Sequence, residues 1–107
     1  MTDNENNSAV LQQTAEFVGS WAQLWLYSPT HSQLVILLER AETKKYLVLY
    51  ECVSVCTPTR WIYRMATLKS DSELGACKFF VSEEDGVEIE FEHMELRDDF
   101  PAIGELP

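Results

Sequence analysis

The groups best suited to chemistry in this 107-residue sequence are its three cysteines and two histidines. A three-residue hairpin loop at Glu84-Asp85-Gly86 would place Cys77 opposite His93 on paired strands, about 5 Å apart. A histidine beside a cysteine can activate the thiolate for nucleophilic attack or share a metal ion with it. Both residues continue the apolar face of the predicted hairpin, where a histidine is more often part of the core. We therefore predict no catalytic site at this pair.

The other two cysteines do not predict a metal site. Cys52 and Cys56 lie in a predicted strand, in which four residues span about 13 Å, whereas the ligands of one zinc ion lie within about 4 Å of each other. An odd number of cysteines without a secretory signal indicates reduced thiols and not a disulfide framework. We expect no metal, no cofactor and a reducing, cytoplasmic compartment.

Aromatic side chains are the stronger candidates for a functional surface. Two predicted strands carry aromatic residues at alternate positions, which would line one face of each strand. A histidine lies in a polar loop between two apolar runs, where such residues bind ligands or close turns. Large aromatic residues dominate both cores and interfaces, so core packing is the alternative interpretation. The predicted ligand or partner face consists of Trp21, Trp25 and Tyr27 on the first strand, Trp61 and Tyr63 on the second, and His31 in the loop.

The segment Phe17-Val18-Gly19-Ser20-Trp21 resembles the Phe-x-Gly-x-Trp opening of lipocalins and fatty-acid-binding proteins. In those families, a short helical piece leads into the first strand of a barrel that holds an apolar ligand. The resemblance covers five of the 107 residues. It implies a barrel of about eight to ten strands, whereas this sequence contains five or six strand-like runs.

A helix is predicted near the N-terminus. Residues 1–7 are polar and rich in Asn, and we expect a flexible tail there, followed by a single domain over residues 8–107. From Ser8, apolar residues recur at helical spacing as far as Gly19, where a glycine suits the end of a helix. Residues 20–27 fit either a continued helix or a strand, and their aromatic content favours a strand.

The rest of the chain is typical of β-structure. Apolar, β-branched and aromatic runs alternate with short turn-like segments. Connections this short cannot cross over a sheet, so neighbouring strands should pair antiparallel. We predict an α+β fold with one N-terminal helix packed on a curved antiparallel β-meander of five or six strands. The five clearest runs are Gln33–Arg40, Lys45–Cys56, Arg60–Leu68, Cys77–Glu83 and Val87–Glu95.

The run Lys45–Cys56 is apolar on both of its predicted faces. Leu47 and Val55 would lie on one face, and Val48 and Cys52 on the other. Such a pattern is typical of a central strand whose sheet is covered on both sides. Since one helix covers one face, the other must be covered by sheet curvature, a second copy of the chain or a ligand.

The charge of the chain excludes some classes of partner. With 18 acidic and 8 basic residues, the net charge is −10, of which the segment Glu83–Pro107 carries −9. This charge argues against binding to nucleic acid or to an anionic membrane surface, and no apolar run reaches the roughly 20 residues of a membrane span. The acidic segment either recruits a basic partner or keeps the molecule in solution.

The leading hypothesis is a small, non-enzymatic binding or adaptor module that self-associates, or binds another protein, through an apolar sheet face. The run Lys45–Cys56, which is apolar on both predicted faces, supports this hypothesis. No recognisable catalytic motif opposes it. The alternative is a carrier that holds a small apolar ligand against aromatic residues in a partial barrel. A third, enzymatic hypothesis would rest on Cys77 and His93.

Overall fold

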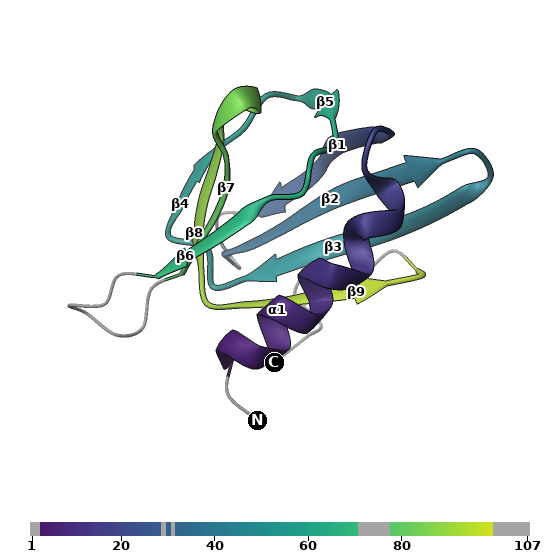
Figure 1. Cartoon of the computed structure of the whole chain (residues 1–107). Helices are drawn as coiled ribbons and strands as arrows, with labels where there is room; N and C mark the ends of the chain where they lie inside the picture. The colour runs from purple at the N-terminus through teal and green to yellow at the C-terminus, as the bar shows by residue number, and fades with distance from the viewer. Residues whose placement is uncertain (1–2, 29, 31, 71–77, 100–107) are drawn as a thin grey trace.

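The computed structural model describes residues 3–28, 30, 32–70 and 78–99. An N-terminal α-helix is followed by two antiparallel sheets, which confirms the predicted α+β class (Figure 1). The helical segments are α1 (Asp3–Gln13) and the 3-10 turns η1 (Thr14–Phe17) and η2 (Glu83–Asp85). Sheet A consists, in order, of β5 (Arg60–Ile62), β1 (Trp21–Ser28), β2 (Gln33–Arg40), β3 (Thr43–Tyr50) and β9 (His93–Arg97). Sheet B consists of β4 (Ser54–Cys56), β8 (Val87–Phe91), β7 (Lys78–Ser82) and β6 (Thr67–Ser70).

Three of the predicted runs bend and contribute one strand to each sheet. The run Lys45–Cys56 breaks after β3 at Glu51, whose φ of 56° lies in the left-handed region. The run Val87–Glu95 breaks at Glu92, beside the first bend, where the Glu92 N–H donates to the Tyr50 carbonyl at 3.2 Å. The run Arg60–Leu68 separates into β5 and β6.

These bends keep the described strands in two separate sheets. The described chain therefore lacks the closed barrel that the resemblance to lipocalins implies.

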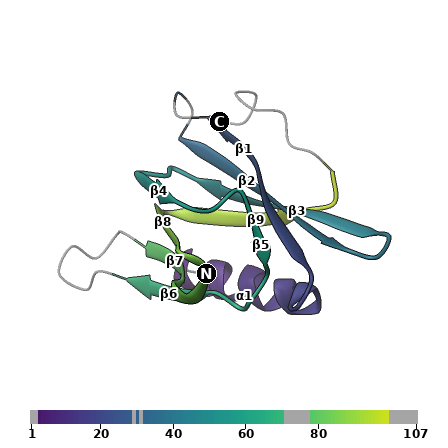
Figure 2. The ribbon, with the colours of Figure 1, turned by 90° about the horizontal axis from the view of Figure 1, so that it is seen from above.

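The core lies between the sheets. In Figure 2, α1 and sheet B lie on the same side of sheet A. Alternate residues of the central strands face this space, among them Ile36 of β2 and Leu47 of β3, which are ladder partners and fully buried. The Tyr63 hydroxyl is also buried and forms a 2.6 Å hydrogen bond with Thr14 Oγ1, which satisfies both polar groups.

The helix begins earlier than the sequence pattern predicts. Residues 3–7, expected in a flexible tail, belong to α1, and Asn7 is fully buried. Asn7 Oδ1 accepts a 3.0 Å hydrogen bond from the Met94 N–H, and Asn7 Nδ2 donates to the Glu92 carbonyl at 3.1 Å. Asn6 Nδ2 also donates to the Met94 carbonyl at 3.3 Å. Two asparagines thus pair with β9 as a further strand would, and they cover an edge of sheet A.

The β7–β8 hairpin differs from its predicted register by one residue. Ser82 pairs with Val87 and Phe80 with Ile89, so the loop has four residues instead of three. The turn η2 accommodates the additional residue, and Gly86 adopts the expected left-handed conformation with φ of 74°. The shift places Phe80 and Ile89 together on the core side, which the predicted register did not.

The central strands are buried on both faces within the single chain. Val35, Leu37 and Val48 point away from the core and are nevertheless buried. The outer face of β2 and β3 is therefore not the exposed apolar surface that the sequence predicts. The alternation expected along Lys45–Cys56 also ends at the Glu51 bend. Cys52 packs in the same core as Leu47 and Leu49, although a continuous strand would place it on the opposite face, and Val53 is 71% exposed.

Candidate partner-binding surface

The strand β1 carries three of the six predicted site residues. The sequence left residues 20–27 open between helix and strand, and they form a strand. Gly19, with φ of 90°, separates this strand from η1 in a conformation that favours glycine. The Gly19 N–H donates to the Tyr63 carbonyl at 2.9 Å and the Tyr63 N–H donates to the Ser20 carbonyl at 2.7 Å. These bonds fix the start of β1 against the end of β5.

A β-bulge at Trp25 separates the aromatic residues of β1. Leu24 pairs with Ile36 and Leu26 pairs with Val35, so Trp25 is an additional residue without a ladder partner on β2. The alternation of side chains reverses there, and Trp21 lies on the outer face of sheet A whereas Tyr27 lies on the core side. The prediction that the aromatic residues of β1 share one face is therefore wrong.

The two aromatic residues after β4 belong to the core. Trp61 pairs with Ala22 across β5 and β1, on the face that packs against the helix, and both are buried. Tyr63 is 1% exposed and bonded to Thr14. We predicted Trp61 and Tyr63 on a ligand or partner face, and this prediction is wrong because both side chains are buried in the core. His31, the sixth predicted residue, lies outside the described residues.

The exposed aromatic surface that remains is centred on Trp21. The Trp21 side chain is 43% exposed, and the guanidinium carbon of Arg60 lies 3.8 Å from the centroid of its ring, in a cation–π contact. Ile62, the ladder partner of Trp21 on β5, is 38% exposed on the same face. Glu39 is the ladder partner on the other side, on β2. We name Trp21, Arg60, Ile62 and Glu39 the tryptophan patch.

Val18 and Trp25 are three and four residues from Trp21 in the sequence, and each is about half exposed. Five of the seven large hydrophobic residues that are exposed in the described part of the chain belong to residues 18–27 or to β5: Val18, Trp21, Trp25, Tyr27 and Ile62. Isolated exposed hydrophobic residues are ordinary on protein surfaces. Of these five, the ladder pairing places Trp21 and Ile62 side by side on the outer face of sheet A, and Tyr27 lies on the other face.

The described thiols and imidazole do not form a nucleophilic site. Burial raises the pKa of the Cys52 thiol to about 12, which keeps it protonated and unreactive. His93 contacts the Tyr50 ring at a centroid distance of 5.6 Å and lies 3.4 Å from Asn6 Nδ2. Its ladder partner is Tyr50 in sheet A, and Cys77, its predicted partner, lies outside the described residues.

Neither a metal site nor a membrane-spanning helix is found in the part of the chain that the structure describes. No three His, Cys, Asp or Glu residues of that part gather closely enough to hold a metal ion. Its helices are too short or too polar to cross a membrane. The tryptophan patch is therefore the candidate functional site that the geometry supports best.

Trp21 is the one member of this patch among the predicted site residues. Glu39, Arg60 and Ile62 are not: Glu39 lies beside Trp21 on β2, whereas Arg60 and Ile62 belong to β5. Each of the latter two is an ordinary residue of a short edge strand, and its relation to Trp21 depends on a β1–β5 pairing between segments about 40 residues apart. The one feature of the sequence that pointed to a strand at Arg60 and Ile62 is the apolar and aromatic content around Trp61.

Comparison of the chain with models of protein families, with curated proteins and with solved structures found no match.

Proposed function

We propose that this chain is a non-enzymatic binding module that associates with a second copy of itself through the tryptophan patch. The observation that carries the proposal is the exposed Trp21 ring, held by Arg60 on a rigid sheet and flanked by exposed Ile62. A large aromatic side chain in a fixed orientation is the kind of residue that dominates the energetics of protein interfaces.

The charges beside Trp21 favour a second copy as the partner. A two-fold interface brings the same surface of two chains together, so the surface must be complementary to itself. Arg60 lies on the β5 side of Trp21 and Glu39 lies on the β2 side. A two-fold axis that runs along β1 at Trp21 would place the arginine of each copy beside the glutamate of the other. The exposed Lys44 that lies 3.6 Å from Glu39 would share this carboxylate with the incoming arginine.

The net charge of −10 opposes association and makes it dependent on salt. Two chains of this charge repel each other, and salt screens the repulsion over about 8–10 Å at ordinary ionic strength. We therefore expect dimerisation to become stronger between low salt and about 0.5 M salt. A partner of opposite charge would show the reverse dependence.

Native mass spectrometry and sedimentation equilibrium test this proposal. We expect a dimer in the range of about 1–200 µM protein, and the variant Trp21→Ser should weaken dimerisation at least about tenfold. The matched control is Val53→Ser. Among the described residues, Val53 is the most exposed large hydrophobic one, and it lies in the β3–β4 crossing instead of the patch. A strict monomer over this range, or equal weakening by both substitutions, would contradict the proposal.

Tryptophan fluorescence separates self-association from the carriage of a small apolar ligand. Dissociation of a dimer shifts the emission on dilution, whereas an apolar ligand shifts it at constant protein concentration. The aromatic residues that such a carrier would use inside the fold, Trp61 and Tyr63, already pack in the core. A cytoplasmic location forms part of our proposal, and the free thiols of Cys52 and Cys56 support it.

A further inference from the structure

The outer face of sheet B is hollowed at a different part of the molecule. Thr67, Val81, Glu88 and Cys56 form a row of ladder partners across the sheet. The next row, which includes Phe80 and Ile89, faces the core, so the first row faces outward. Two adjoining hollows, of about 310 and 400 Å³, lie over this outward row and beneath η2.

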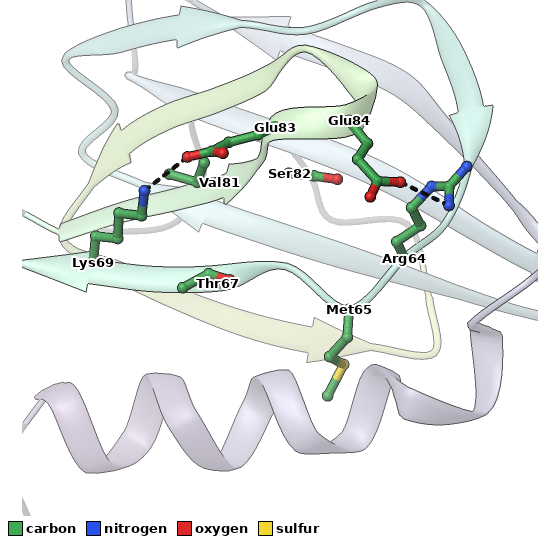
Figure 3. A pocket seen from close by; sticks show the side chains of 8 residues that line it. All are labelled: Arg64, Met65, Thr67, Lys69, Val81, Ser82, Glu83 and Glu84. Carbon is green, nitrogen blue, oxygen red and sulfur yellow. Dashed lines mark hydrogen bonds and ion pairs between the residues drawn. The ribbon is translucent and has the colours of Figure 1, made fainter.

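A single ion pair lies where the two hollows adjoin. Lys69, Val81 and Glu83 line both of them, and Lys69 Nζ lies 3.0 Å from Glu83 Oε1 (Figure 3). Arg64 forms a second pair with Glu84 at 2.9 Å, at the far side of the first hollow. The side chains of both pairs are more than half exposed to solvent. Ion pairs this exposed contribute little and open readily, so a ligand can displace them.

Part of the floor of the hollows is apolar. Val81 and Val87 are buried below it, although Val81 points to the outward side of the sheet. Such a floor suits the methylene stem of a lysine or arginine side chain, which covers apolar surface while its charged end reaches a polar rim.

The rim of the hollows is strongly acidic. Five carboxylates lie on η2 and on the outward side of β8, against two cations, Arg64 and Lys69, which already have acidic partners. Glu88 and Glu90 form no ion pair with any residue that the structure describes. The five carboxylates are those of Glu83, Glu84 and Glu88, which line the hollows, and those of Asp85 and Glu90, which lie next to them on η2 and β8.

We propose that the outward face of sheet B binds a basic segment of a partner protein. Lysine or arginine side chains of the segment lie over Val81, and their charged ends pair with Glu88 and Glu90. A further cation takes the place of Lys69 on Glu83. The net charge of −10 raises the rate at which such a segment meets the molecule. This surface is separate from the tryptophan patch, so either proposal can fail without the other.

Fluorescence anisotropy with a labelled hexalysine peptide tests the proposal, with hexaglutamate as the negative control. The double variant Glu88→Gln/Glu90→Gln should weaken hexalysine binding about five- to tenfold. The matched control, Glu16→Gln/Glu42→Gln, removes the same charge from exposed residues outside both hollows. Lys69→Ala should strengthen binding about threefold, because it frees the Glu83 carboxylate and joins the two hollows. Raising the salt concentration should weaken binding of the peptide to the unaltered protein.

Three results would overturn the proposal. The first is equal loss of affinity in both double variants, which would indicate attraction by the overall charge alone. The second is binding of hexalysine no tighter than that of hexaglutamate. The third is equally tight binding of spermine, which would indicate a small polyamine as the ligand instead of a protein segment. Circular dichroism of each variant shows whether the fold is retained, and all the altered carboxylates are on the surface.

Discussion

Replacing Asn7 by alanine should reveal how much the fold depends on the covered edge of β9. The asparagine side chain is fully buried and bonds the Met94 N–H at 3.0 Å and the Glu92 carbonyl at 3.1 Å. The substitution removes both bonds from the backbone of β9. A buried backbone group that loses its partner costs about 1–3 kcal/mol, so two groups together cost about 3 kcal/mol if water reaches one of them.

This loss is large for a domain of this size. Small domains are stable by about 5–15 kcal/mol, and 1 kcal/mol shifts the melting temperature of a chain near 100 residues by about 4 °C. We therefore expect Asn7→Ala to lower the melting temperature by about 12 °C. Urea unfolding, followed by tryptophan fluorescence, measures the corresponding change in the free energy of unfolding, and its slope should remain unchanged.

The neighbouring variant Asn6→Ala is the control. Asn6 is half-buried, and its contacts with Met94 and His93 are longer, at 3.3 and 3.4 Å. We expect it to cost less than about 1 kcal/mol. Hydrogen exchange provides a local measurement, because the Met94 amide should lose protection only when Asn7 is replaced. Equal destabilisation by the two variants, or an unchanged Met94 protection factor in Asn7→Ala, would refute the reasoning.

Two further predictions concern the thiols and the β7–β8 turn. Burial raises the pKa of Cys52 from 9.0 to about 12. Above pH 9 the unfolded chain therefore binds fewer protons than the native protein, and the free energy of unfolding should fall as the pH rises to about 12. The fall should be less steep in Cys52→Ala. In the native protein, alkylation with peptide mapping should label exposed Cys56 well before Cys52; equal rates would contradict the burial. Gly86 has φ of 74°, and the space that an added Cβ would occupy is open. Gly86→Ala should therefore lower the free energy of unfolding in urea by about 1 kcal/mol through backbone strain alone. Gly86→Asn should lower it less. Equal losses in the two variants would exclude this explanation.

The sequence predicts the type of most elements but not where the chain changes sheet. The run of apolar and β-branched residues identifies β2, and the aromatic content of residues 20–27 favours the strand that forms there, although helix remained an alternative. Both signals lie in neighbouring residues. The apolar residues of Lys45–Cys56 fit a central strand only as far as Tyr50, where β3 ends. At Glu51 the chain crosses to the other sheet. A left-handed residue of this kind has no distinctive local pattern when it is not glycine.

The candidate surface is only partly visible in the sequence for the same reason. Trp21 is an obvious aromatic residue, yet the bulge at Trp25 decides which of its neighbours share its face. The contact with Arg60 depends on a strand about 40 residues away. Asn7 likewise resembles part of a polar tail until β9, nearly 90 residues later, supplies its partners. Long-range pairing thus determines what the local pattern leaves open.

The position of β8 and β9 has a consequence for the order in which the protein can acquire its structure. β8 lies between β4 and β7, and β9 completes the other sheet beside β3, although both come from the last quarter of the described chain. During synthesis, β1, β2 and β3 can form a sheet early, but β4 has no neighbour until Val87–Phe91 leaves the ribosome. Completion of sheet B therefore waits for β8, and the nascent chain must keep its aromatic residues from premature contacts until then.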